Sequence, residues 1–291
     1  MRFKTFLVIV FSLLCLFAVN AFCQEKETDE DNFFASEEKF CETMKSAGIK
    51  EAFAIFGFNG TTIVQSSSIN FKEWFSGLEE GRKMEFYPSK MVVSSSKDFG
   101  FSVGAWKESK DAKIGIWGNY LNVWKKVGKE WKILIHSKNV MPPQIAFKKS
   151  QNCEKIELSS ERKAANNPAK KESELFAVLK EYGWAKIYNE FADDDVIRMR
   201  SDSILEIGKK GIFIKSVAER GYIEGKSKKS VSSKSKDLVM FLGSAKTGGP
   251  TITAQGSFIH IWKKDSEGNY KLFLDLFISE RTTDRIRKKL L

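Results

Sequence analysis

The hydrophobic and polar positions alternate most clearly between residues 118 and 135, in the stretch GNYLNVWKKVGKEWKILI. Apolar side chains at every second position on both sides of a Gly-containing turn predict two antiparallel strands joined as a hairpin. A similar pattern returns at 256–274, GSFIHIWKKDSEGNYKLFL. The chain therefore carries the same predicted hairpin twice.

The residues before the first hairpin show the spacing of helices. Apolar side chains recur at intervals of three, four and seven residues over 33–56 and are interrupted at Gly48, which predicts two helices or one bent helix. A short strand at 61–65 and a short amphipathic helix from Phe71, ending at Gly81, follow. Further strands are expected at 84–93, 99–106, 118–126 and 131–136.

The second half of the chain repeats the first. Residues 39–64 align without a gap on 174–199, and this places Gly48 on Gly183. Between the copies lies a polar, Pro-containing region without a sustained apolar period, which predicts a linker or an irregular strap across a domain face. The predicted divisions are a signal peptide at 1–23, a polar leader at 24–32, a first domain at 33–140, a linker at 141–168 and a second domain at 169–291.

The N-terminus has the pattern of an export signal. Arg2 and Lys4 precede an apolar run at 6–19, and small residues allow cleavage after Ala21 or just before Gln24. The run is short for a membrane span, so we expect a periplasmic or secreted protein with no span after cleavage. Lipoprotein anchoring through Cys23 is not expected, because Phe22 and Asn20 stand where such sites have a small residue and usually Leu.

Composition adds size and charge to this picture. The 291 residues include 24 Phe and 7 Trp, enough for two buried cores. The formal charge of +11 becomes +9 when Arg2 and Lys4 are removed, but the lysines are spread among many acidic residues. We therefore expect the charge to serve solubility and expect no nucleic acid as a partner. The basic segment 225–236 lacks interleaved aromatic residues and is predicted to be a solvated hairpin loop.

Cysteine and histidine usage limits the chemistry. Outside the export segment only Cys41 and Cys153 remain, and they could form a disulfide or stay free. The chain has two histidines, neither with a second ligand at metal-binding spacing, so no metal site is predicted. No phosphate-binding glycine motif is present either, and no cofactor is predicted.

Two motifs resemble a known family. The stretch DFGFSVG at 98–104 and the hairpin at 118–132 are similar to the signature of the SnoaL-like branch, domain of unknown function 4440, of the nuclear-transport-factor-2-like superfamily. The second copy keeps Gly256 and Trp262-Lys263-Lys264 of the hairpin. The resemblance implies two tandem α+β domains, each a cone in which N-terminal helices pack on a strongly curved antiparallel sheet. It also implies a possible pocket between helices and sheet for a small apolar or amphipathic molecule.

Strand alternation indicates which side chains would face such a pocket. Tyr120, Asn122 and Trp124 share one face of the first hairpin, whereas Leu121 and Val123 share the other. The corresponding residues of the second copy are Phe258, His260 and Trp262. A polar residue in the middle of an aromatic face suits a ligand pocket, and it equally suits a hydrogen-bonded core group.

The last strands supply two candidates for proton transfer. His136 and Asp275 align with each other, and each follows an apolar strand segment. Either could act as an acid or base if enclosed, or it could lie at an exposed rim. Because the two residues differ, one shared mechanism in both domains is not expected.

Three functions are compatible with these features. The leading hypothesis is an exported binding protein for small molecules or partners without catalysis. The alternatives are an enzyme of the isomerase, dehydratase or cyclase type, which the superfamily resemblance implies, and a structural protein whose two domains, or two copies, pack through their sheets.

Overall fold

The computed structural model describes residues 32–110, 113–150, 152–159, 163–201, 203–217, 219, 222–248 and 253–279. The predicted signal peptide, its Cys23 and the leader up to residue 31 lie outside the described residues. No helix in the described ranges is long and apolar enough to cross a membrane.

The first domain is a sheet of seven strands with three helices, arranged β2-β1-β6-β5-β4-β3-β7. Its helices are α2 (Phe33–Ser46), α3 (Ile49–Phe56) and α4 (Phe71–Ser76). Its strands are β1 (Thr62–Val64), β2 (Ser68–Asn70), β3 (Glu85–Val93), β4 (Phe99–Lys110), β5 (Lys113–Val127), β6 (Glu130–Lys138) and β7 (Glu154–Glu157).

The second domain repeats this plan with six strands, ordered β10-β11-β12-β13-β8-β9. Its helices are α5 (Pro168–Glu190) and α6 (Lys209–Ser216). Its strands are β8 (Ala192–Arg200), β9 (Glu206–Ile207), β10 (Tyr222–Ser232), β11 (Leu238–Gly248), β12 (Thr253–Lys264) and β13 (Tyr270–Ser279). Two sheets, each preceded by helices, confirm the predicted fold class of two tandem α+β domains.

The repeated glycine bends both helical segments in the same way. Gly48 has φ 99° and separates α2 from α3, and a Cβ there would come within 2.9 Å of the Arg82 carbonyl oxygen. The aligned Gly183 has φ 77° and kinks α5. Both values lie in the left-handed region that favours glycine. The sequence of the first domain predicted two helices or one bent helix, and that domain has two helices, α2 and α3. The second domain has the other form, the single bent helix α5.

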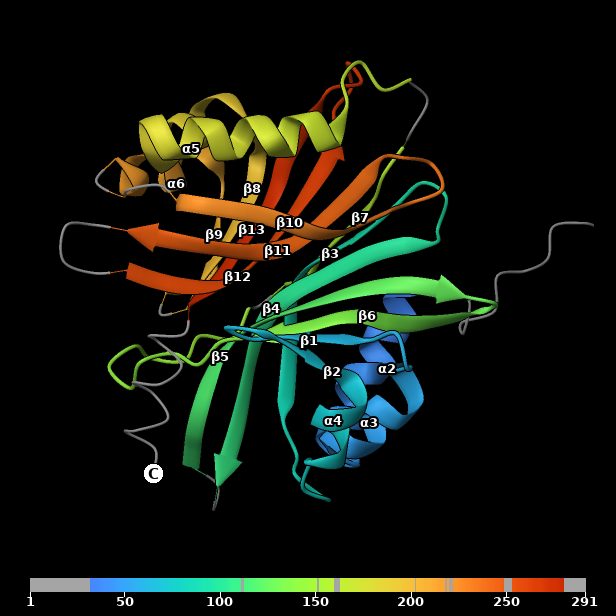
Figure 1. Cartoon of the computed structure of the whole chain (residues 1–291). Helices are drawn as coiled ribbons and strands as arrows, with labels where there is room; N and C mark the ends of the chain where they lie inside the picture. Colours follow the sequence, from blue (N-terminus) through green and yellow to red (C-terminus); the bar gives the residue numbers. More distant parts are fainter. Residues whose placement is uncertain are drawn as a thin grey trace, which may run out of the picture.

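The two sheets pack against each other, with the helices on the outer sides (Figure 1). One buried core joins side chains from both sheets, including Leu121 and Val123 of β5 and Phe273 of β13. The ring centroids of Phe101 and Phe273 lie 5.7 Å apart across this interface. The hairpin face opposite the candidate pocket thus lies in a core shared by both domains, so of the two pairings that the sequence left open, the structure shows the one within the chain.

A pair of repeated turns closes one end of this interface. The Asp98 carboxylate accepts a hydrogen bond from the Lys234 amide at 3.1 Å, and the Asp237 carboxylate accepts one from the Ser95 amide at 2.7 Å. The hydroxyls of Ser96 and Ser235 lie 2.9 Å apart between them. The aligned SKD sequences therefore form a reciprocal contact, as in a two-fold dimer.

Two segments differ from the sequence prediction. The 225–236 segment is not a hairpin loop: up to Ser232 it is the edge strand β10, whose lysines keep the exposed edge polar, and the turn follows. The region predicted as a linker or strap also contributes β7, which runs parallel to β3. Neither strand shows alternating hydrophobicity, because each lies at the edge of a sheet.

Candidate functional site

A buried glutamate on α2 is the centre of the polar cluster inside the first domain. The inner face of α2 places Glu37 between Phe33 and Phe40, and its side chain is fully buried. Its carboxylate accepts hydrogen bonds from the Tyr120 hydroxyl at 2.9 Å and the Trp124 indole at 2.8 Å. Burial raises the pKa of Glu37, and the hydrogen bonds from the strand side chains offset part of that shift.

Asn122 links this glutamate to His136. Its side-chain nitrogen lies 3.5 Å from Glu37 Oε2, so its carbonyl oxygen faces His136 Nδ1, 2.7 Å away. Because that oxygen can only accept, Nδ1 of His136 carries the hydrogen. Burial, with a smaller effect of Lys138, lowers the pKa of His136 to about 3. The imidazole is therefore neutral, and its Nε2 is a bare acceptor.

The surroundings of His136 Nε2 are aromatic. The rings of Phe53, Trp74 and Phe86 lie 5.0, 6.1 and 6.2 Å from the imidazole centroid. Nε2 has no hydrogen-bond partner among the described residues. Buried polar atoms are rarely left in this state. The first cone therefore contains unused hydrogen-bonding capacity.

The second domain builds a related cluster around Glu172. This residue occupies the position of Glu37 in the repeat and accepts a hydrogen bond from the Trp262 indole at 2.8 Å. Nδ1 of His260, at the position of Asn122, lies 2.9 Å from Glu172 Oε1. Phe258 packs on this imidazole, with centroids 4.5 Å apart.

Asp275 closes the second cluster with ion pairs. Arg200 donates to its carboxylate from both terminal nitrogens, at 3.0 and 2.5 Å, and the Tyr188 hydroxyl donates at 2.5 Å. Burial alone would raise the pKa of Asp275, but Arg200 and then His260 hold it well below its usual range. Burial would likewise lower the pKa of His260, but Glu172 and Asp275 raise it to about 9. This cluster consists of oppositely charged partners, although His260 Nε2, 3.6 Å from Asp275 Oδ1, makes no hydrogen bond among the described residues.

The structure brings the sequence candidates together within each domain. The register pairs Asn122 with His136 on β5 and β6, and His260 with Asp275 on β12 and β13. All are buried in the cone interiors, together with Tyr120, Trp124, Phe258 and Trp262. Among the described residues, no group of three His, Cys, Asp or Glu side chains is placed to hold a metal ion.

Sequence reasoning missed the two glutamates. Extending the ungapped alignment by two residues superposes Glu37 on Glu172, and Glu37 falls on the apolar helix stripe between Phe33, Phe40 and Met44. An identical charged residue on an otherwise apolar helix face was the available signal.

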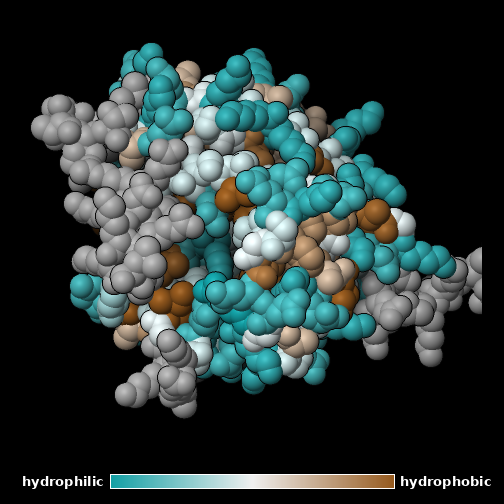
Figure 2. All heavy atoms as spheres, turned by 60° about the horizontal axis from the view of Figure 1, so that its bottom comes forward, coloured by the Kyte–Doolittle hydropathy of each residue, from teal (hydrophilic) through white to brown (hydrophobic). Residues whose placement is uncertain are grey.

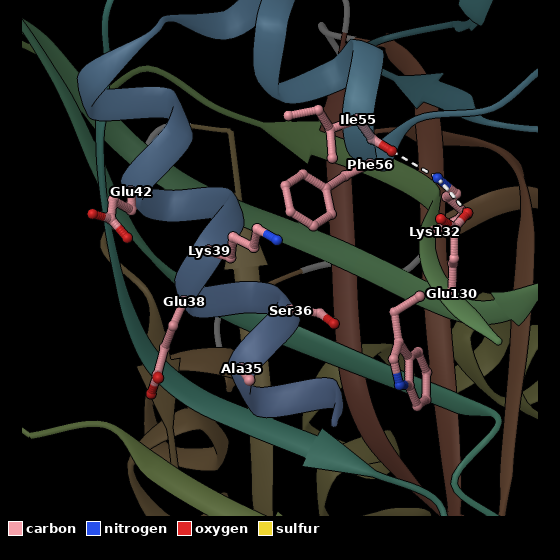
Figure 3. Close-up of a pocket in the computed structure, with 10 residues that line it drawn as sticks. Ala35, Ser36, Glu38, Lys39, Glu42, Ile55, Phe56, Glu130 and Lys132 are labelled. Carbon is pink, nitrogen blue, oxygen red and sulfur yellow. Dashed lines mark hydrogen bonds and ion pairs between the residues drawn. The ribbon is translucent and has the colours of Figure 1, made fainter. Parts of the chain in front are cut away.

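A surface groove of about 610 Å³ lies beside these helices, outside the cone interior. Figure 3 shows α2 on one side of it and the first residues of β6, Glu130 and Lys132, on the other, with Ile55 and Phe56 between them. The Lys132 ammonium donates to the Ile55 carbonyl oxygen at 2.7 Å. The rim has both acidic and basic side chains, and none of the sequence candidates lines this groove.

The two histidines give opposite contributions to the pH dependence of stability. The imidazole of His136 gains a proton near pH 6.5 only when the chain unfolds, so its contribution is lost as pH falls from about 6.5 toward about 3. The stability that His260 provides is full below about pH 6.5 and is lost as pH rises toward about 9.

We therefore expect His136→Asn to gain stability relative to the parent as pH falls below about 6.5, and His260→Asn to gain relative to the parent as pH rises above it. Urea unfolding midpoints of both variants and the parent across this range measure the difference. On the acid side Glu37, whose pKa burial raises, changes the stability in the opposite direction to His136. Because the parent and both variants keep Glu37, the difference between their pH curves isolates each histidine. Parallel pH curves for parent and variants would contradict the assigned charge states.

Comparison with known proteins gives similarity in structure only. No protein-family model and no curated protein sequence matches the chain. Nuclear transport factor 2 from Cryptosporidium parvum is similar over 38% of this chain and 90% of its own, with 11% identity and a TM-score of 0.31. A ketosteroid isomerase-like protein from Erwinia carotovora atroseptica is similar over 37% and 92%, with 12% identity and a TM-score of 0.30. A protein from Jannaschia, provisionally named a SnoaL-like polyketide cyclase, is similar over 40% and 88%, with 9% identity and a TM-score of 0.30.

Each of these structures covers a share of the chain close to one domain. The fold itself is defined by the two sheets and their helices described above.

Proposed function

We propose that the protein is an exported binding protein, that its first domain holds a small molecule inside the cone, and that its second domain is a structural partner. The difference between the two polar clusters carries this proposal. In the first domain, His136 Nε2 is a buried acceptor without a partner among the described residues. In the second domain, Asp275 occupies the equivalent position and is held by Arg200 and Tyr188. His260 Nε2 also makes no hydrogen bond among the described residues, but it lies 3.6 Å from the Asp275 carboxylate, so its positive charge has an ionic partner that His136 lacks.

The chemistry favours binding over catalysis. A general base works best when its pKa lies near the operating pH. The pKa of His136 is lowered to about 3, which makes the imidazole a weak base but leaves it a good hydrogen-bond acceptor. The low pKa of Asp275 and its pairing with Arg200 make the second cluster unsuited to proton abstraction as well. A ligand with a hydroxyl or N–H donor and an apolar body matches the acceptor Nε2 and the aromatic rings that pack around His136.

Access to this site requires movement of α4. The helix has six residues, and Trp74 packs on His136 with its side chain only partly buried. Displacement of this ring would open a path from solvent to Nε2. The helix therefore acts as the cover of the first cone, and the paired sheets form the rigid base.

A matched pair of probes tests the proposal. We expect 4-methylphenol to perturb the imidazole resonances of His136 in nitrogen-15 NMR spectra and to bind at least about tenfold more tightly than toluene, which lacks the hydroxyl donor. His136→Phe should abolish this preference, and Trp74→Ala should speed entry of the probe. Equal binding of both probes, or a perturbation centred on His260, would contradict the proposal.

The export part of the proposal is supported by Arg2, Lys4 and the apolar run at 6–19. N-terminal sequencing of the mature protein tests it. A start at Phe22 or Gln24 is expected, and an intact Met1 would contradict it.

A further inference from the structure

A second groove, of about 490 Å³, lies between the two domains, away from both cone interiors. Trp117, Ile145 and Ala105 line it from the first domain, and Ile204 and Ile207 line it from the second. Its volume falls in the range of small-molecule sites in proteins. On the face shown in Figure 2, hydrophobic residues lie in small groups among hydrophilic ones, and a hollow opens near the middle of the view.

The segment after β6 forms one wall of this groove and is fixed in place. The Trp117 indole donates to the Ile145 carbonyl oxygen at 3.0 Å, and the ring of Phe147 packs on Trp117 at 5.6 Å. On the other side, Asn119 donates from its side chain to the Ser203 carbonyl oxygen at 3.0 Å. Both walls are therefore held by hydrogen bonds to β5, and the groove is a feature of the paired domains together.

The lining combines aliphatic surface with positive charge. Ile204 and Ile207 keep 49% and 47% of their surface exposed, large values for isoleucine. Lys148 and Lys149 also line the groove, and no acidic side chain is found among the described residues that line it. The groove beside α2 differs in this respect, because Glu38, Glu42 and Glu130 accompany its lysines.

We propose that the groove between the domains binds an aliphatic anion with a single hydrocarbon chain, such as a fatty-acid carboxylate. The chain lies between Ile204, Ile207 and Trp117, and it covers the apolar surface of the two isoleucines that water now contacts. The anionic head group lies at Lys148 and Lys149. The concave shape and the limited volume suit one amphiphilic molecule rather than a bilayer surface.

Calorimetric titration of the full-length protein with dodecanoate, dodecan-1-ol and dodecyltrimethylammonium, each below its micelle concentration, tests the proposal. We expect dodecanoate to bind at least about tenfold more tightly than the alcohol and the cation not to bind. The double variants Lys148→Gln with Lys149→Gln, and Ile204→Ser with Ile207→Ser, should each weaken dodecanoate binding by about tenfold or more.

The matched control is Lys39→Gln with Lys132→Gln in the groove beside α2, which should leave dodecanoate binding unchanged. His136→Phe should also leave it unchanged, which separates this site from the proposed cone site. Equal affinity for the three probes, an equal loss in the control variant, or no binding of dodecanoate would overturn the proposal.

Discussion

Replacement of Asp275 by alanine is expected to destabilise the protein by about 3–5 kcal/mol, the cost of removing one partner from a buried ion pair. The carboxylate is fully buried and accepts hydrogen bonds from Arg200 and Tyr188. Without it, the positive charges of Arg200 and His260 lose their shared partner inside the second cone. Urea unfolding at neutral pH measures the change in the free energy of unfolding.

An exposed carboxylate gives the control for this substitution. Glu190 pairs with Lys186 on the surface of α5, with more than 40% of both side chains exposed, so Glu190→Ala should cost less than about 1 kcal/mol. A second substitution, Arg200→Met, in the Asp275→Ala background should recover part of the loss, because it removes the unpaired charge. If Asp275→Ala costs no more than Glu190→Ala, the second cluster does not stabilise the domain as described.

Replacement of Phe101 by alanine is expected to cost about 3–5 kcal/mol, because it leaves a cavity in the core between the two sheets. Phe101 is fully buried and contacts Phe273 of the other domain. Since each sheet packs against the other, we expect amide hydrogen exchange to accelerate in β13 as well as in β4.

Phe75→Ala provides the comparison for that experiment. Phe75 on α4 is only partly buried and packs in a tilted arrangement on Phe71 within the first domain. Its loss should cost less and leave exchange in β13 unchanged. Faster exchange confined to the first domain in Phe101→Ala would show that the sheets are not energetically coupled.

The fold could be predicted from local sequence patterns because the hairpins obey strict alternation. Leu121 and Val123 were assigned to the face opposite Tyr120, Asn122 and Trp124, and the two faces do lie in different cores. The repeat also aligns Asn122 with His260 and His136 with Asp275. The strand register agrees with this alignment, because the first residue of each set lies opposite the second in both domains: Asn122 opposite His136, and His260 opposite Asp275. Elements at sheet edges, β7 and β10, were not recognised because edge strands do not need an apolar face.

The polar clusters could be predicted only in part. The strand residues followed from alternation, but Glu37 and Glu172 come from helices distant in sequence, and their partners became clear only when helix and sheet were packed. The groove between the domains is lined partly by the segment around Ile145. This segment has no regular spacing of apolar residues, so its position could not be predicted from the sequence. Sites formed by irregular segments and by two domains together are therefore the least accessible to sequence reasoning.

The charge states of the two histidines test the central claim most directly, and they are the only histidines in the chain. Nitrogen-15 NMR spectra of the imidazole rings at neutral pH should show one neutral ring with its hydrogen on Nδ1, from His136, and one doubly protonated ring, from His260. His136→Asn and His260→Asn assign the two signals. Two rings that titrate together near the ordinary histidine pKa of about 6.5 would contradict an open acceptor in the first cone and a closed ion cluster in the second.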